Sequence, residues 1–182
     1  MVTARLNLVR ITPEVDGDIA AILSDPEVMY AWEHGFTQSE CKEWFCRQYA
    51  RYAQGQEGLF AAVLRKTGQV IGYCGITAQD ISGYTPLGGE AVGFGEKCEV
   101  WEIGYALAKE FWHRGYAIEA ARACKLLSAA LGIQKIYSII RTNNLPSIRV
   151  AERNGMRPVG DVVKHCRGKE MPHIIFCANN FD

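Results

Sequence analysis

The sequence predicts an α/β (α+β) fold in which one mixed, mostly antiparallel sheet carries helices on both faces, within a single domain of residues 1–182. Three observations favour this fold. The expected elements follow one another in the order βααβββαβαββ, which combines hairpin-linked strands with strands linked through helices. The chain of 182 residues, 48% of them hydrophobic, is long enough to bury one sizeable core. No repeat, low-complexity segment or linker divides it.

The N-terminal part is expected to form a strand followed by two helices. Residues 5–11 alternate apolar and polar side chains, as a half-buried strand does. Thr12 is a suitable N-cap for a helix over residues 12–23, the proline after it suits the first helical turn, and a Ser-Asp-Pro sequence ends the helix. Residues 38–54 place aromatic side chains at helical spacing, which predicts the second helix.

The middle of the chain is expected to form a hairpin and then a long connection. Residues 59–64 and 70–76 resemble strands, and the Arg-Lys-Thr-Gly-Gln sequence between them is typical of a turn. Residues 79–97 are expected to form a mobile loop, because they contain five glycines: Gly83, Gly88, Gly89, Gly93 and Gly95.

The C-terminal part is expected to alternate strands and helices before a final hairpin. In chain order its elements are a strand at 100–107, a helix at about 115–131, a strand at 135–140, a helix at 146–153, and a hairpin of 159–166 and 173–177. Gly132 and Gly155 are expected to cap the two helices.

Composition excludes several classes of protein. Formal net charge is zero, and Lys and Arg do not gather in runs, so nucleic acid is not expected as the main ligand. No apolar run approaches the ~18 residues of a membrane span, and the N-terminus lacks the features of a signal peptide, so a cytoplasmic protein is expected. Seven scattered cysteines without a Cys-x-x-Cys pair favour reduced thiols.

A glycine-bearing loop is expected between the strand that ends at residue 107 and the helix that follows it. Gly115 allows backbone amides to approach a large ligand, and the helix start adds unpaired N–H groups and the positive end of the helix dipole. This combination suits a pyrophosphate. The Lys-Ser/Thr of an NTPase loop and the Gly-x-Gly-x-x-Gly of a dinucleotide site do not occur there.

Four segments, in this order and spacing, resemble the GNAT acetyltransferases and in particular their RimJ/RimL-like branch. They are Arg-Leu-Asn-Leu-Val-Arg at 5–10, Leu-Ser-Asp-Pro-Glu-Val-Met at 23–29, the motif at 102–120, and the segment at 144–156 with its Asn-Leu-Pro-Ser start and Asn-Gly-Met end. The likeness covers nearly the whole chain. It implies the GNAT fold, with acetyl-CoA as co-substrate in the cleft between two splayed central strands.

The resemblance also implies which residues hold acetyl-CoA. The strand backbone would pair with the pantetheine arm, and the loop amides would bind the pyrophosphate. The expected set is Ile103, Gly104, Tyr105, Ala106 and Leu107 in the strand, Trp112, His113, Arg114, Gly115, Tyr116 and Ala117 in the loop, and Asn144. His113 could donate to a phosphate or simply be exposed. Asn144 could cap a helix, hydrogen-bond to the pantetheine, or do both.

Two residues are expected to move protons. Glu102, at the start of the strand, could act as general base on the acceptor amine, directly or through water; the alternative is a solvated charge. Glu99 and His34 are weaker candidates for the base. Ala151 replaces the tyrosine that many family members use as the acid, and Ser147, one helical turn earlier, stands where this branch has its proposed acid. The alternative is that Ser147 caps or packs the helix start.

The acceptor is expected to be an amine, either a protein N-terminus or a small molecule, and the branch resemblance favours the former. Trp32, Glu33 and His34 lie where the family grips its acceptor. A homodimer through the closing hairpin is a further possibility, because dimers are common in the branch. No metal is expected, since His165 and Cys166 would point to opposite faces of a strand.

The hypothesis is a cytoplasmic, acetyl-CoA-dependent N-acetyltransferase that works by direct attack, without a covalent enzyme intermediate. Two alternatives stay open. One is a catalytically silent acyl-CoA-binding sensor, which the alanine at position 151 permits. The other is a partner-binding scaffold with no affinity for CoA.

Overall fold

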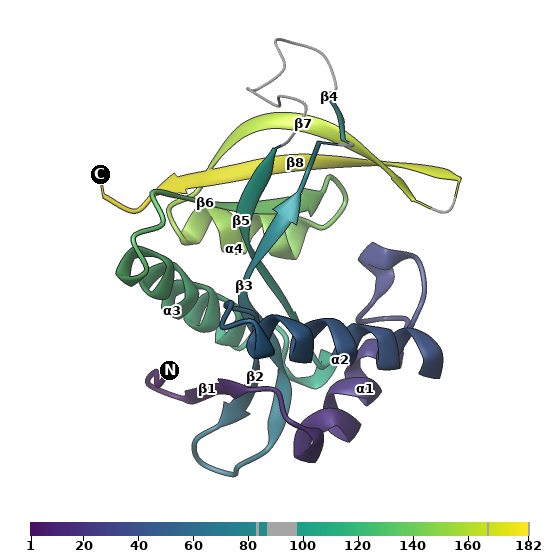
Figure 1. Ribbon diagram of the computed structural model, residues 1–182, viewed down its shortest axis with the longest axis vertical. Coiled ribbons are helices and arrows are strands. Elements are labelled where there is room, and N and C mark those ends of the chain that lie inside the picture. The colour runs from purple at the N-terminus through teal and green to yellow at the C-terminus, as the bar shows by residue number, and fades with distance from the viewer. Residues whose placement is uncertain (83, 87–97, 167, 182) are drawn as a thin grey trace. The chain divides into compact units, whose positions relative to one another are not determined.

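The computed structural model describes residues 1–82, 84–86, 98–166 and 168–181 (Figure 1). The chain forms two compact units, one of Met1–Thr77 with Gly104–Cys124 and the other of Ala78–Ile103 with Lys125–Asp182. Strands β3 (Val70–Asp80) and β5 (Glu99–Leu107) and helix α3 (Tyr116–Ala130) contribute residues to both units. The predicted order of helices and strands is confirmed, with a short strand β4 and three 3₁₀ turns in addition.

The first unit is built on antiparallel strands. β1 (Leu6–Arg10) pairs with β2 (Leu59–Leu64), β2 pairs with β3 through the predicted hairpin, and β5 neighbours β3. Gly72 of β3 lies so close to β5 that a Cβ there would stand 2.2 Å from the carbonyl oxygen of Ala106. Only glycine permits this approach of two backbones.

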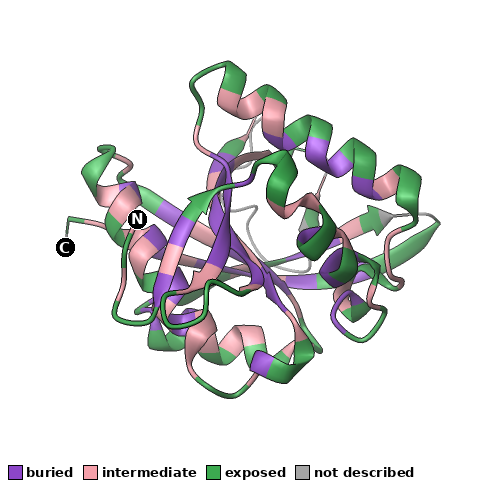
Figure 2. Ribbon diagram, turned by 90° about the horizontal axis from the view of Figure 1, so that it is seen from below, coloured by how far each residue is buried: buried purple, intermediate pink, exposed green. Residues whose placement is uncertain are grey.

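Helices cover both faces of the strands in this unit. On one face, α1 (Asp16–Ser24) and α2 (Gln38–Ala53) share a hydrophobic core with β2 and β3, in which the Trp44 and Tyr73 ring centroids are 5.1 Å apart. The next residue, Cys74, points to the other face, and its Sγ lies 3.4 Å from a thiol of α3. Figure 2 shows buried residues concentrated in the strands and exposed residues on the outward sides of the helices.

In the second unit the strands lie in the order β5, β6 (Lys135–Arg141), β8 (Lys169–Asn179), β7 (Arg157–Cys166) and β4 (Thr85–Pro86). β6 pairs antiparallel with β8, and β8 forms the closing hairpin with β7, whereas β5 runs parallel to β6. Helix α4 (Leu145–Arg153) follows β6. The mixed, mostly antiparallel sheet is therefore confirmed.

Several boundaries differ from the predictions. The helix expected at 12–23 begins as a 3₁₀ turn over Pro13–Val15, and the Thr12 side chain makes no capping hydrogen bond there. The closing hairpin is longer than predicted, because β7 begins at Arg157 and β8 runs from Lys169 to Asn179, with Met171 continuing the alternating burial of β8. β3 extends to Asp80. Most of the connection predicted at 79–97, including its five glycines, lies outside the described residues.

Candidate functional site

The loop of residues 112–115 joins a 3₁₀ turn to the first turn of α3. Gly115 has a φ of 79°, in the left-handed region that favours glycine. His113 also has a positive φ, 58°, which is uncommon for a residue with a side chain. Left-handed residues that alternate with right-handed ones turn successive N–H groups to one side, and the helix start adds unpaired donors. The backbone here is therefore suited to bind an anion.

The side chains of this loop lie in different surroundings. Those of His113 and Arg114 are exposed, as one of the two expectations for His113 had it. Trp112 is half-buried against the core of the first unit, and its indole N–H donates to the carbonyl oxygen of Leu107 at 2.7 Å. Trp112 thus fastens the loop to the end of β5.

β5 and β6 separate almost where they meet. Within the described part of the chain, Glu102 and Tyr137 are the one Cα pair that joins the two strands. The Ile139 amide donates to Oε1 of Glu102 at 3.2 Å, and the Ser138 hydroxyl donates to the Ile103 carbonyl at 3.3 Å. Side chains therefore replace the regular main-chain ladder at this point, as expected for strands that splay apart.

Glu102 is half-buried, and its carboxyl group is partly desolvated. Burial raises the pKa of Glu102 above its ordinary value, while the Lys164 ammonium and the hydrogen bond from the Ile139 amide act in the opposite direction. A carboxylate with a raised pKa is a stronger base and titrates closer to neutral pH. Glu99, on the same strand, is exposed, so the environment favours Glu102 over Glu99 as a base.

Asn144 and Ser147 belong to the start of α4. The Asn144 side chain accepts a hydrogen bond from the Ser147 backbone N–H at 3.2 Å and is the N-cap of the helix. The capping alternative is therefore confirmed for Asn144, while this bond uses the backbone of Ser147 and not its hydroxyl. Ser147 is half-buried, and Ala151, one turn later, is buried.

Trp32, Glu33 and His34 lie between α1 and α2. Trp32 is 46% exposed, which is high for a tryptophan, and Glu33 has a left-handed backbone with a φ of 73°. The ring nitrogens of His34 contact the Trp32 carbonyl and the Glu40 carboxylate, each at 3.0 Å, and Glu40 also forms a capping box with the N-cap residue of α2. Both nitrogens of His34 thus have partners, which makes it a poorer candidate for the base than Glu102.

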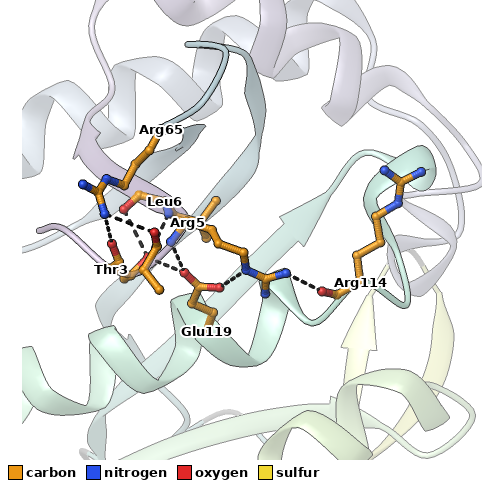
Figure 3. Close-up of polar contacts among 7 residues, drawn as sticks. Thr3, Arg5, Leu6, Arg65, Arg114 and Glu119 are labelled. Carbon is orange, nitrogen blue, oxygen red and sulfur yellow. Dashed lines mark hydrogen bonds and ion pairs between the residues drawn. The ribbon is translucent and has the colours of Figure 1, made fainter.

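Each compact unit brings together part of the predicted set. The first contains the loop, the strand end Gly104–Leu107 and the segment Trp32–His34. The second contains Glu102, Ile103, Asn144 and Ser147. Sequence reasoning gave no role to Arg5 and Glu119, although Arg5 bonds to the loop and the Glu119 carboxylate accepts from Arg5 (Figure 3).

The described residues contain no group of three or more His, Cys, Asp or Glu side chains that could hold a metal ion. None of their helices has the length and apolar character needed to cross a membrane.

Comparisons with a family model and with related sequences both lead to acetyltransferases. Residues 5–157 match the family model of the acetyltransferase (GNAT) domain. The chain is 33% identical over 138 residues to the uncharacterised protein YkkB of Bacillus subtilis, covering 74% of this chain and 71% of that protein. It is 29% identical over 153 residues to the uncharacterised N-acetyltransferase p20 of Bacillus licheniformis, covering 81% and 76% of the two chains.

Solved structures share the fold at low sequence identity. A GNAT-family acetyltransferase from Bacillus anthracis has a TM-score of 0.73 at 20% identity, covering 100% of this chain and 99% of that one. Spermidine N-acetyltransferase from Vibrio cholerae, in complex with CoA and spermine, has a TM-score of 0.70 at 15% identity, covering 96% and 95%. Ribosomal-protein-S5-alanine acetyltransferase from Vibrio fischeri has a TM-score of 0.69 at 18% identity, covering 97% and 93%.

Proposed function

Because the chain belongs to the GNAT family of acetyltransferases, we propose that it transfers the acetyl group of acetyl-CoA to a primary amine by direct attack. The observation that carries the proposal is the backbone before α3. His113 and Gly115 both adopt positive φ angles there, in a chain whose residues 5–157 match the family. A row of N–H groups at a helix start fits a pyrophosphate, which is an anionic part of CoA.

The donor-binding role is assigned to two stretches of backbone. The amides of residues 112–117 would hold the pyrophosphate, and the backbone of Ile103–Leu107 would pair with the pantetheine arm. The departure of β5 from β6 after Glu102 supports this assignment, because it frees strand backbone for another partner. Asn144 would contact the pantetheine in addition to its capping role. Acetyl-CoA supplies an activated acyl group as a thioester.

Proton transfer is assigned to two side chains. Glu102 would take the proton of the attacking amine, directly or through water, and its partly desolvated carboxylate suits that task. Ser147 would donate a proton to the departing thiolate, which is a modest task because thiolates leave with little help. An amide of β5 would support the oxyanion of the tetrahedral intermediate. No enzyme nucleophile is required.

The acceptor is proposed to be a protein N-terminus or a small-molecule amine, gripped in part by Trp32, Glu33 and His34. Structural neighbours include an enzyme named for a ribosomal protein and another named for spermidine, so the shared fold favours neither class. We place the protein in the cytoplasm, because free thiols suit a reducing compartment. The free cysteines are Cys41, Cys46, Cys74, Cys98, Cys124 and Cys177. A homodimer is proposed from the branch resemblance.

The test is thiol release from acetyl-CoA in the presence of short peptides with varied N-termini and a set of small amines. Fast release with one class of acceptor is the expected result and identifies that class. Calorimetry with CoA is run alongside. CoA binding without thiol release from any acceptor would favour the sensor that the alanine at position 151 permits. Absence of CoA binding would contradict both functions.

A further inference from the structure

Arg5, at the start of the chain, contacts the loop and the first turn of α3 at several points (Figure 3). Its Nη1 donates to the carbonyl oxygen of Arg114 at 2.9 Å, and its Nε donates to Oε2 of Glu119 at 2.6 Å. Its guanidinium also lies over the Tyr116 ring, 4.3 Å from the centroid. All these residues belong to the first compact unit. One side chain therefore joins the loop, the helix start and the N-terminal segment.

The bond to the Arg114 carbonyl fixes the orientation of the next amide. In a planar trans peptide, the C=O of one residue and the N–H of the next point in opposite directions. Because the Arg114 oxygen is turned toward Arg5, the N–H of Gly115 is turned away from it. The positive φ of Gly115 is set in the same turn of backbone. Arg5 thus decides which way a loop amide proposed to bind phosphate points.

Glu119 in turn holds Arg5 and its segment in place. Its Oε1 accepts from the Arg5 backbone N–H at 2.7 Å and from the Thr3 hydroxyl at 2.6 Å, while Oε2 accepts from the Arg5 side chain. Burial alone would raise the pKa of Glu119, but the hydrogen bonds from Thr3 and Arg5 outweigh it and lower the pKa. Arg65 adds two bonds from its Nη1, to the carbonyl oxygens of Thr3 and Ala4.

We propose that Arg5 and Glu119 are positioning residues for donor binding: together they set the peptide orientation of the loop at Gly115 and so determine affinity for the pyrophosphate part of CoA. The inference rests on the proposed function. Neither residue needs to touch the donor for this role. Glu119 makes the idea testable, because a carboxylate near a bound pyrophosphate should weaken binding by its charge alone. Positioning predicts the opposite effect when that charge is removed.

The experiment compares calorimetric affinities for CoA and for pantetheine, which lacks the pyrophosphate, in wild type and in the variants Arg5→Gln, Arg5→Lys and Glu119→Gln. Arg10→Gln is the matched control, because Arg10 is an exposed arginine of β1 whose guanidinium lies over Tyr52, away from the loop. Losing charge-assisted hydrogen bonds should weaken CoA binding roughly ten- to a hundredfold in the Gln variants. Arg5→Lys should also weaken it, since lysine lacks the planar fork. Pantetheine affinity should change less than about twofold.

Three results would overturn the inference. Tighter CoA binding by Glu119→Gln would show a charge effect and not positioning. An equal loss of CoA and pantetheine affinity would show general damage to the fold, which the melting temperature of each variant records independently. Unchanged CoA affinity in Arg5→Gln would show that the loop holds its shape without this contact. Failure of the proposed function is distinguishable, because wild type itself would then not bind CoA or not release thiol.

Discussion

At Glu102, a carboxylate accepts the Ile139 amide that a regular parallel ladder would have given to a main-chain carbonyl. The same residue forms the pair at which β5 and β6 meet. Its position therefore couples two properties: the strands begin to separate here, and the group next to the opening is a base with a raised pKa. Nothing in the spacing of the sequence alone revealed the bond to Ile139, which lies 37 residues away.

The raised pKa of Glu102 predicts that Glu102→Gln makes the fold more stable at mildly alkaline pH. The unfolded chain ionises this carboxyl more readily than the folded protein does, so above the raised pKa the charge destabilises the fold. The Ile139 amide keeps an acceptor in the variant. Thermal melts at about pH 8 should show a higher Tm than wild type, and the gain should shrink as pH falls through the raised pKa. Glu99→Gln is the control, and a lower Tm for Glu102→Gln at alkaline pH would contradict the argument.

At the level of single residues, a backbone conformation was predictable where the residue type alone favours it. Gly115 was expected to adopt a special backbone conformation, and it does. The positive φ of His113 was not expected, because it remains uncommon outside glycine even though histidine adopts it more often than most residues. The partnership of Arg5 and Glu119 spans 114 residues of sequence, and such a pair cannot be recognised from one chain by spacing.

At the scale of elements, the start of α4 contains a capping residue and a proposed acid, whose roles the sequence could not distinguish. Asn144 caps the helix through the Ser147 backbone, and the Ser147 hydroxyl is not part of that bond. In the same helix, Ala151 is buried and Leu145 is exposed. A structural role at Asn144 and a chemical role at Ser147 can therefore be tested one at a time.

Asn144→Ala should lower the free energy of unfolding by about 1 kcal/mol, the usual cost of losing an N-cap side chain. Ser147→Ala should leave stability almost unchanged and lower turnover roughly ten- to a hundredfold, because it removes a proposed acid and keeps the capped amide. Urea unfolding and thiol-release assays on both variants check this. Wild-type turnover in Ser147→Ala would contradict the acid role.

The helices and strands with a clear hydrophobic pattern were predicted with accurate boundaries. The errors lie at the ends of other helices and strands. The 3.6-residue pattern of α2 and the continuous apolar run of β2 predicted both elements with boundaries within about two residues. The helix start at 12–23 was wrong in form, because proline at the first turn is compatible with a 3₁₀ turn as well as an α-helix. β8 was predicted too short: it runs from Lys169 to Asn179 and not only over 173–177, and the buried Met171 continues its alternation.

At the scale of the whole molecule, a buried histidine links stability to pH. His173 of β8 is 6% exposed, and burial lowers its pKa to about 4, although the hydrogen bond with the Met171 carbonyl acts the other way. The charges of Lys164 and Arg141 lower this pKa further. The unfolded chain binds a proton near pH 6.5 and the folded protein does not, so stability falls as pH drops from 6.5 to about 4.

The predicted loss from this one group is about 3 kcal/mol over that interval. His173→Gln should be less stable than wild type near neutral pH, because packing is disturbed, and should show a shallower loss of stability with acid. Urea midpoints measured across the interval check the slope. His165→Gln, an exposed histidine of β7, is the control and should retain the wild-type slope. An unchanged slope in His173→Gln would show that other groups dominate acid unfolding.

The whole fold and its family were within reach of the sequence, because four motifs in order constrain the complete chain and the 5–157 family match agrees with them. The acceptor was not within reach. Its binding is proposed to involve residues 32–34, whose conformation depends on contacts such as that of His34 with Glu40 that the sequence did not predict. The similarity to solved structures is at low sequence identity, so it shows the fold alone. The acceptor has to be identified by experiment.

The most direct test of the central claim is a single-turnover measurement with acetyl-labelled CoA and the best acceptor from the panel, in wild type, Glu102→Gln and Glu99→Gln. Wild type and Glu99→Gln should move the label to the amine nitrogen without labelling the protein. Glu102→Gln should slow transfer roughly a hundredfold or more while its calorimetric affinity for CoA stays unchanged. Label that accumulates covalently on the protein, or transfer by Glu102→Gln at the wild-type rate, would contradict direct attack assisted by Glu102.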